Sequence, residues 1–144
     1  MSRIPFIAAA LVQLGLAPVV AADPALELVA AATAGRVETV ADLLAQGADA
    51  NAKGSAGRPA LVSAAFNGNR RTAAALIVAG ADPNAVDAAG NTALMGASAM
   101  GHAETVRLLI AAGAKKDMKN AAGEDAATMA QRAGHAAVEE ILSQ

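Results

Sequence analysis

The chain has 144 residues, a formal net charge of −2, an aromatic content of 1% and no cysteine. The missing cysteine excludes disulfides, thiolate metal sites and a thiol nucleophile, and the small net charge does not favour nucleic acid or an anionic membrane as a partner. Alanine supplies most of the 55% hydrophobic content, so a core must consist of closely packed helices with small side chains at their contacts.

Residues 1–22 have the three parts of a secretory signal peptide. Arg3 gives the positive start, an apolar stretch follows over Ile4–Leu16, and small residues come next. Val20 and Ala22 are small residues three and one before a cut after Ala22, as the signal peptidase requires. We therefore predict a signal peptide at 1–22 and a mature chain that is periplasmic or secreted.

Two alternatives to cleavage stay open at this point. In the first, the uncleaved segment is an amphipathic or apolar arm packed on the first repeat, and in the second it is a membrane tether. A membrane-spanning helix needs about 20 apolar residues. Here Pro5, Gly15 and Pro18 interrupt the stretch and disfavour a helix. After cleavage we expect no stable membrane insertion.

Glycine recurs with a period of 33 residues along the rest of the chain. Three ladders have this period: Gly35, Gly68, Gly101 and Gly134; Gly47, Gly80 and Gly113; Gly57, Gly90 and Gly123. An internal repeat of this length is typical of a stack of small units, each buried against its neighbours. The period favours a binding surface over a single core with one catalytic pocket.

Each unit reads as a turn, a short helix, a glycine break, a second helix and a glycine stop. Thr92 precedes the first helix of one unit as a predicted cap. We expect positive φ at the turn glycines and at the glycines that follow the helices. Ala64-Ala65 and Ala97-Ser98 are small enough to let first helices approach closely. Leu76-Ile77 and Leu108-Leu109-Ile110 form the predicted buried stripe of the second helices.

This pattern resembles the ankyrin repeat. The stretch from Asn91-Thr-Ala-Leu-Met to Gly113-Ala114 has the repeat's residues, and so does Leu76-Ile-Val-Ala-Gly-Ala-Asp-Pro-Asn84. The ending Gly-Ala-Asp-x-Asn occurs twice, at Gly47–Asn51 and Gly80–Asn84. The resemblance covers residues 24–144. It implies an all-α ankyrin-repeat solenoid of four helix-turn-helix repeats with β-turn connections.

The predicted ankyrin repeat domain spans 23–144, with four repeats at about 24–53, 54–86, 87–119 and 120–144. The first and fourth are expected to act as caps, because a terminal repeat faces water on one side. The family's Thr-Pro-Leu-His tetrapeptide is altered here, to Pro59–Val62, Thr92–Met95 and Asp125–Thr128. No histidine follows the leucine, so we expect the usual Thr–His hydrogen bonding to be absent.

No residue pattern predicts catalysis, a metal or a cofactor. His102 and His135 occupy the same slot, and the resemblance implies a structural role for them at the start of the second helix. No third ligand at metal-site spacing accompanies them. Ser98 lies in a sequence that falls one residue short of a Gly-x-Ser-x-Gly elbow, inside a predicted helix. The basic run at Lys115-Lys116 lacks aromatic stacking partners, so we expect no nucleic acid partner. We predict that the protein is not an enzyme.

The resemblance also implies where a partner binds. The turn tips and the exposed side of the first helices of an ankyrin stack form a concave face. The matching positions flank the early glycine of each repeat and precede its middle glycine. In this sequence they are Ser55, Arg58, Phe66, Asn67, Asn91, Met100, Glu124 and Arg132.

Phe66 and Met100 are the apolar anchors among these positions, since most of the others on this face are alanine. The alternative is that both side chains fold back over the alanine-rich groove between repeats. Arg58, Arg132 and Glu124 are expected to orient a partner as rim charges.

The sequence thus predicts a monomeric, exported bacterial protein that binds another protein, as a stabiliser or regulator of an enzyme in its compartment or by acting on a host protein. A small-ligand binder or an enzyme is the alternative from another class. A metabolite-induced rise in melting temperature would favour that alternative.

Overall fold

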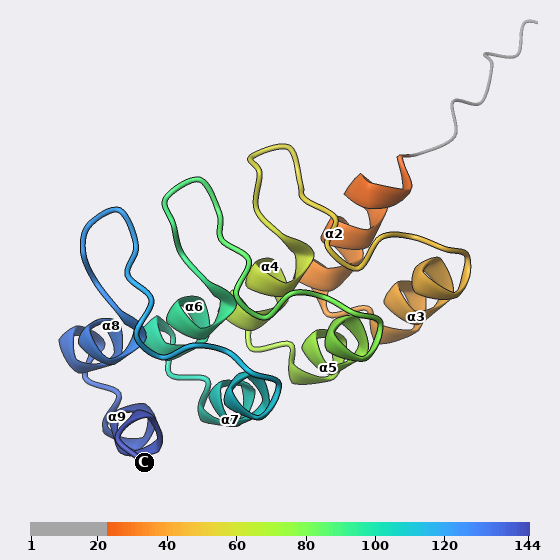
Figure 1. The fold of residues 1–144 in the computed structure, drawn as a ribbon. Helices are drawn as coiled ribbons and strands as arrows, with labels where there is room; N and C mark the ends of the chain where they lie inside the picture. The colour runs from red at the N-terminus through yellow and green to blue at the C-terminus, as the bar shows by residue number, and fades with distance from the viewer. Residues whose placement is uncertain (1–22) are drawn as a thin grey trace, which may run out of the picture.

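The computed structural model describes residues 23–144, so the predicted signal peptide lies outside the described residues. It contains eight helices in four antiparallel pairs, and the fold prediction is confirmed (Figure 1). The first helices of the pairs are α2 (Pro24–Ala34), α4 (Ala60–Phe66), α6 (Ala93–Ala99) and α8 (Ala126–Ala133). The second helices are α3 (Val37–Ala45), α5 (Arg70–Val78), α7 (Ala103–Ala111) and α9 (Ala136–Leu142).

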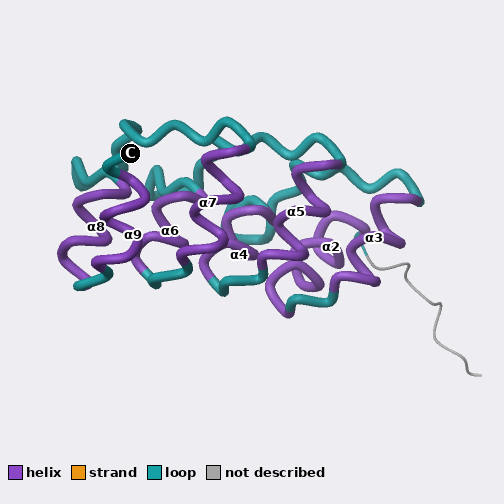
Figure 2. The backbone as a smooth tube through the Cα atoms, turned by 90° about the horizontal axis from the view of Figure 1, so that it is seen from below, coloured by secondary structure: helices purple, strands orange, loops and turns teal. Residues whose placement is uncertain are grey.

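First helices stack on first helices and second helices on second helices, which gives two parallel rows (Figures 1 and 2). The three loops 46–59, 79–92 and 112–125 join successive pairs, and we call them finger loops. Their tips project away from the second helices (Figure 1). Within the first two, the isolated antiparallel bridges Lys53–Pro59 and Val86–Thr92 close the base of each tip. We use "concave face" for the finger loops together with the exposed side of the first helices.

Small side chains bring the first helices together. Ala64, Ala65 and Ala97 are fully buried between α4, α6 and their neighbours, which confirms the prediction for these positions. Leucines at one repeat slot, Leu61 and Leu94, fill the remaining space and are buried as well. Since alanine loses no side-chain entropy in a helix, this packing suits short helices of seven residues.

The predicted stripe of the second helices is only partly correct. Leu76 and Leu109 are fully buried, whereas Ile77, Leu108 and Ile110 are half-buried. A run of two or three adjacent apolar residues covers too wide an arc of a helix for all of them to face one neighbour.

The asparagine of the Gly-Ala-Asp-x-Asn ending links each finger loop to the next. The Asn51 side chain accepts from the Asp82 N–H at 2.7 Å and donates to the Gly80 carbonyl at 3.3 Å. Asn84 repeats this, accepting from Lys115 N–H at 2.8 Å and donating to the Gly113 carbonyl at 3.2 Å. The motif is therefore a hydrogen-bonded joint between repeats.

A second joint runs along the opposite, short loops. His102 Nε2 lies 3.1 Å from the Phe66 carbonyl, and His135 Nε2 lies 3.1 Å from the Ala99 carbonyl. Asn69 takes the same slot in the preceding repeat and donates to the Ala32 carbonyl at 3.0 Å. Each of these side chains thus bonds to the end of the previous first helix, in agreement with a structural role for the histidines.

The caps of α6 and α8 occupy one repeat slot but differ in chemistry. The Thr92 hydroxyl accepts from the Met95 N–H at 3.2 Å, which confirms the predicted cap, and the Met95 sulfur accepts from the Thr92 N–H at 3.5 Å. In this repeat a weak sulfur acceptor therefore stands where the family has histidine. In α8 the cap is Asp125, whose carboxylate accepts from both the backbone N–H and the hydroxyl of Thr128.

The Asp125 cap makes the stability of α8 depend on pH. The hydrogen bond from the Thr128 backbone lowers the pKa of the Asp125 carboxyl, with the Thr128 hydroxyl and the charge of Lys119 as lesser causes. A lowered folded pKa means that the cap stabilises the fold above about pH 4, the unfolded value, and is lost as pH falls through the folded pKa. We expect Asp125→Ala to cost about 1 kcal/mol at neutral pH and this cost to shrink in acid.

Denaturant unfolding of wild type and Asp125→Ala across the acid range tests this expectation. Thr92→Ala is the matched control, since its hydroxyl caps at the same slot and does not titrate. A cost of Asp125→Ala that stays constant while the pH falls contradicts the assignment.

Ser98 is a polar side chain in the core with no partner. It lies in α6, is fully buried, and its hydroxyl makes no hydrogen bond. An unpaired buried hydroxyl costs about 1–3 kcal/mol, and alanine is also the better helix former. We therefore expect Ser98→Ala to raise the free energy of unfolding by about 1 kcal/mol. Ser55→Ala, at an exposed turn, is the control, and an unchanged or lower stability for Ser98→Ala would contradict the expectation.

Candidate functional site

The eight predicted contact residues come from two kinds of element. Ser55, Arg58, Asn91 and Glu124 belong to the finger loops, whereas Phe66, Asn67, Met100 and Arg132 lie at or just after the C-terminal ends of the first helices. The structure gathers Arg58, Phe66 and Asn91 around one cavity. The other five lie outside it.

Arg58 and Phe66 form the contact that connects loop and helix. The guanidinium carbon of Arg58 lies 5.8 Å from the centre of the Phe66 ring, within cation–π range. Arg58 also lies 3.9 Å from the carboxylate of Asp87 in the next finger loop. The Arg58 side chain is 48% exposed, so the pair leaves much of the guanidinium open to solvent.

Asp87 orders the tip of its own finger loop. One carboxylate oxygen accepts from the Ala89 N–H at 3.0 Å and from the Asn91 N–H at 2.9 Å. The Asn91 side chain in turn accepts from Asn120 of the following loop at 2.9 Å. Asn91 is therefore half-buried in a network that holds two loops together.

Phe66 lies with one side on α6 and the other in water. The residue is 39% exposed, and a Cβ placed on Gly96 would lie 3.5 Å from three Phe66 carbon atoms. Phe66 thus covers part of the groove next to Gly96 and still presents an apolar surface to a partner. Met100, after α6, is 47% exposed and is not part of the cavity wall.

The remaining predicted residues are spread along the face. Glu124 and Arg132 form an ion pair within the fourth repeat, in which Arg132 is 66% exposed and Glu124 only 18%. Asn67 donates from its side chain to the Ser63 carbonyl of its own helix at 3.0 Å. Ser55 is exposed at its loop tip.

Four residues that the sequence analysis missed help to complete the cavity: Asp87, Val62, Gly96 and Met129. Ala99, the fifth, is one of the alanines that were expected on this face. Gly96 could have been noticed in the sequence. A glycine inside a helix costs about 1 kcal/mol relative to alanine, so it often has a packing or functional reason. Met129 could not have been noticed, because the stacking of the repeats decides which residues lie opposite it in the cavity.

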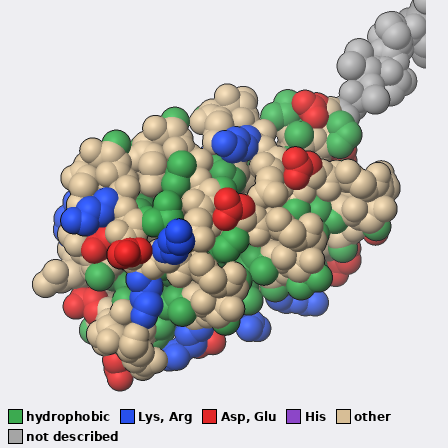
Figure 3. Space-filling view, in the orientation of Figure 1, with side chains coloured by type: hydrophobic (Ala, Val, Ile, Leu, Met, Phe, Trp, Pro, Cys, Tyr) green, Lys and Arg blue, Asp and Glu red, His purple; other side chains and the backbone are tan. Residues whose placement is uncertain are grey.

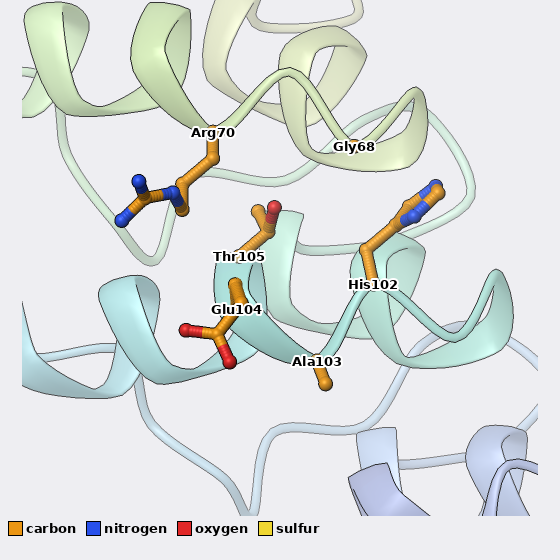
Figure 4. A pocket seen from close by; sticks show the side chains of 6 residues that line it. All are labelled: Gly68, Arg70, His102, Ala103, Glu104 and Thr105. Carbon is orange, nitrogen blue, oxygen red and sulfur yellow. The ribbon is translucent and has the colours of Figure 1, made fainter.

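A second, shallower hollow lies on the side of the short loops (Figure 4). Arg70 and Glu104 extend into it from neighbouring repeats, whereas the His102 ring turns toward Gly68. His102, like Asn69 and His135 at the same repeat slot, bonds to the preceding repeat. We therefore interpret this hollow as a gap between stacked repeats and not as a reactive site. Within residues 23–144, no three His, Cys, Asp or Glu side chains lie together as metal ligands.

On the face shown in Figure 3, hydrophobic atoms form short patches between charged side chains of both signs. This mixture is typical of a surface for a protein partner and lacks the uniformly basic field that favours nucleic acid. None of the helices over residues 23–144 has the length and apolar character that a membrane span requires.

A comparison with known protein families matches residues 28–120 to the family described as ankyrin repeats, three copies. A comparison with curated proteins gives no match.

Proposed function

The chain belongs to the ankyrin repeat family, and from this we propose that it binds a partner protein through its concave face. Ankyrin repeats generally mediate protein–protein binding, and an ankyrin domain is typically a module without catalytic activity. The observation that carries the proposal for this face is the exposure of Phe66 and Met100 on a face that is otherwise rich in alanine. A few well-packed side chains provide most of the binding energy of an interface, and Phe and Met are enriched in interfaces.

The proposed place of action is the bacterial periplasm or the outside of the cell. Its support is the signal-peptide pattern of residues 1–22. In that compartment a monomeric binding module stabilises or regulates an enzyme, or acts on a host protein after secretion. Partner binding also stabilises a small repeat stack, because a ligand that binds only the folded state raises its stability.

Export is tested by the intact mass of the protein recovered from a host that secretes the full chain. We expect the chain to begin at Asp23. A mass that retains residues 1–22 would support the membrane-tethered scaffold instead.

The binding face is tested by crosslinked pull-down from native extract with the exported protein. The variant Arg58→Ala/Phe66→Ala/Met100→Ala is expected to lose the captured partner while its helical circular dichroism is retained. Arg71→Ala/Val78→Ala is the matched control, because both residues are exposed on α5, away from the concave face. A partner held equally by both variants would move the site to another surface.

A further inference from the structure

We propose that the cavity between α4, α6 and α8 receives the branched aliphatic tip of one partner side chain, and that carboxylates flank this side chain on the partner. The inference rests on the proposed function and specifies the chemistry of the partner. Its support comes from how the cavity arises, from its size and from the charges around it.

The cavity exists because the third repeat has smaller residues than its neighbours at two repeat slots. Gly96 shares its repeat slot with Ser63 and Met129, and Ala99 shares its slot with Phe66 and Arg132. Phe66 on one side and Met129 on the other therefore become walls above a bare stretch of α6. The hollow therefore results from the small residues Gly96 and Ala99 of α6.

The size of the cavity selects among apolar side chains. Its volume is about 60 Å³, less than half of the about 150 Å³ of a cavity that binds benzene. The space therefore accepts a small aliphatic group. This fits the end of a leucine or valine side chain and excludes an aromatic ring.

In the ion pairs on this face the arginine is more exposed to solvent than its acidic partner. The Asp87 side chain is only 9% exposed and already accepts from two backbone N–H groups, while Arg58 is 48% exposed. The same asymmetry holds in the fourth repeat, where Arg132 is 66% and Glu124 is 18% exposed. A partner thus meets guanidinium groups, and guanidinium forms its strongest hydrogen bonds with carboxylates.

The first experiment uses short capped peptides and the full exported protein, with methyl NMR of the methionines as the readout. A peptide with a central leucine between acidic residues is expected to shift the Met129 signal, which lines the cavity, and to leave that of Met118 in place. Peptides with phenylalanine or alanine at the centre, or with lysines as flanks, are expected to bind at least tenfold more weakly.

The second experiment fills the cavity without damage to the fold. A methyl group on Gly96 would lie 3.5 Å from Phe66, an ordinary contact, and alanine is a better helix former. Gly96→Ala is expected to melt at the same or a higher temperature and to bind the leucine peptide at least tenfold more weakly. Adding Ala99→Leu is expected to abolish binding. Ala41→Leu, at an exposed position of α3, is the control that keeps it.

Three outcomes would overturn the proposal. Binding that survives Gly96→Ala/Ala99→Leu places the peptide elsewhere, and equal binding of all peptides removes the stated selectivity. The third is self-association, seen by sedimentation and lost with Leu26→Ala. Leu26 is exposed and lies between Asp23 and Glu27 in the sequence, so this result would mean that a second copy of the chain fills the cavity. If the peptides fail while the triple variant still loses its partner in the pull-down, the proposed function stands and this inference alone falls.

Discussion

Replacing Gly101 by alanine is expected to lower the free energy of unfolding by about 3 kcal/mol. Gly101 has φ +76°, a left-handed conformation that costs an L-residue about 1–2 kcal/mol. A Cβ at this position would also lie 2.6 Å from the His135 ring, which is held against it by its bond to the Ala99 carbonyl. The ring and its helix must move, and such overpacking costs about 1–3 kcal/mol more. Denaturant unfolding gives the value.

Gly134 provides the control, because it occupies the same slot in the last repeat. Its φ is +79°, but no atom lies within 4 Å of an added Cβ. Gly134→Ala is therefore expected to cost only the conformational part, about 1–2 kcal/mol. Adding His135→Ala to Gly101→Ala should recover part of the loss, which a double-mutant cycle measures as a coupling energy. Equal losses for the two glycine variants would show that the close approach of His135 has no energetic weight.

The two glycines also mark what the sequence was able to predict. A positive φ at Gly101 and Gly134 follows from the repeat pattern, because each glycine ends a short helix at the same slot. The close contact with His135 does not follow from that pattern alone. It depends on how far one repeat rotates against the next, and this is a property of packing between repeats.

The candidate site divides in the same way. Exposure of Phe66 and Met100 is found where the resemblance to the ankyrin family placed contact residues. Their grouping was not predictable, since Arg58 joins Phe66 at one cavity and Met100 remains outside it. The cavity depends on the small residues Gly96 and Ala99, and small residues carry little information in a chain so rich in alanine.

The Gly-Ala-Asp-x-Asn ending shows a further limit. The motif identifies the family from sequence, but its physical role lies in bonds between residues about 30 positions apart, as from Asn84 to the Gly113 carbonyl and the Lys115 N–H. Neither helical periodicity nor turn preference predicts which residues so far apart form hydrogen bonds, because both are local patterns. In the third ending Asp117 stands at the slot of Asn51 and Asn84.

The second large effect is expected for Leu94→Ala, which should cost about 3–4 kcal/mol. Leu94 is fully buried in α6, one of the two inner first helices, which packs against α4, α7 and α8. Truncation removes apolar contacts and leaves a hole that short, rigidly joined helices close poorly.

Because each repeat contacts only its neighbours, weakening the third repeat also weakens the link between the two ends of the stack. We therefore expect a lower midpoint and, in addition, a smaller denaturant m-value for Leu94→Ala, as the two ends begin to unfold separately. Val78→Ala, at a residue that is 88% exposed, is the control and should change stability by less than about 0.5 kcal/mol. A Leu94→Ala variant with an unchanged m-value and a loss below about 1 kcal/mol would mean that the alanine-rich interfaces, and not the leucines, hold the stack together.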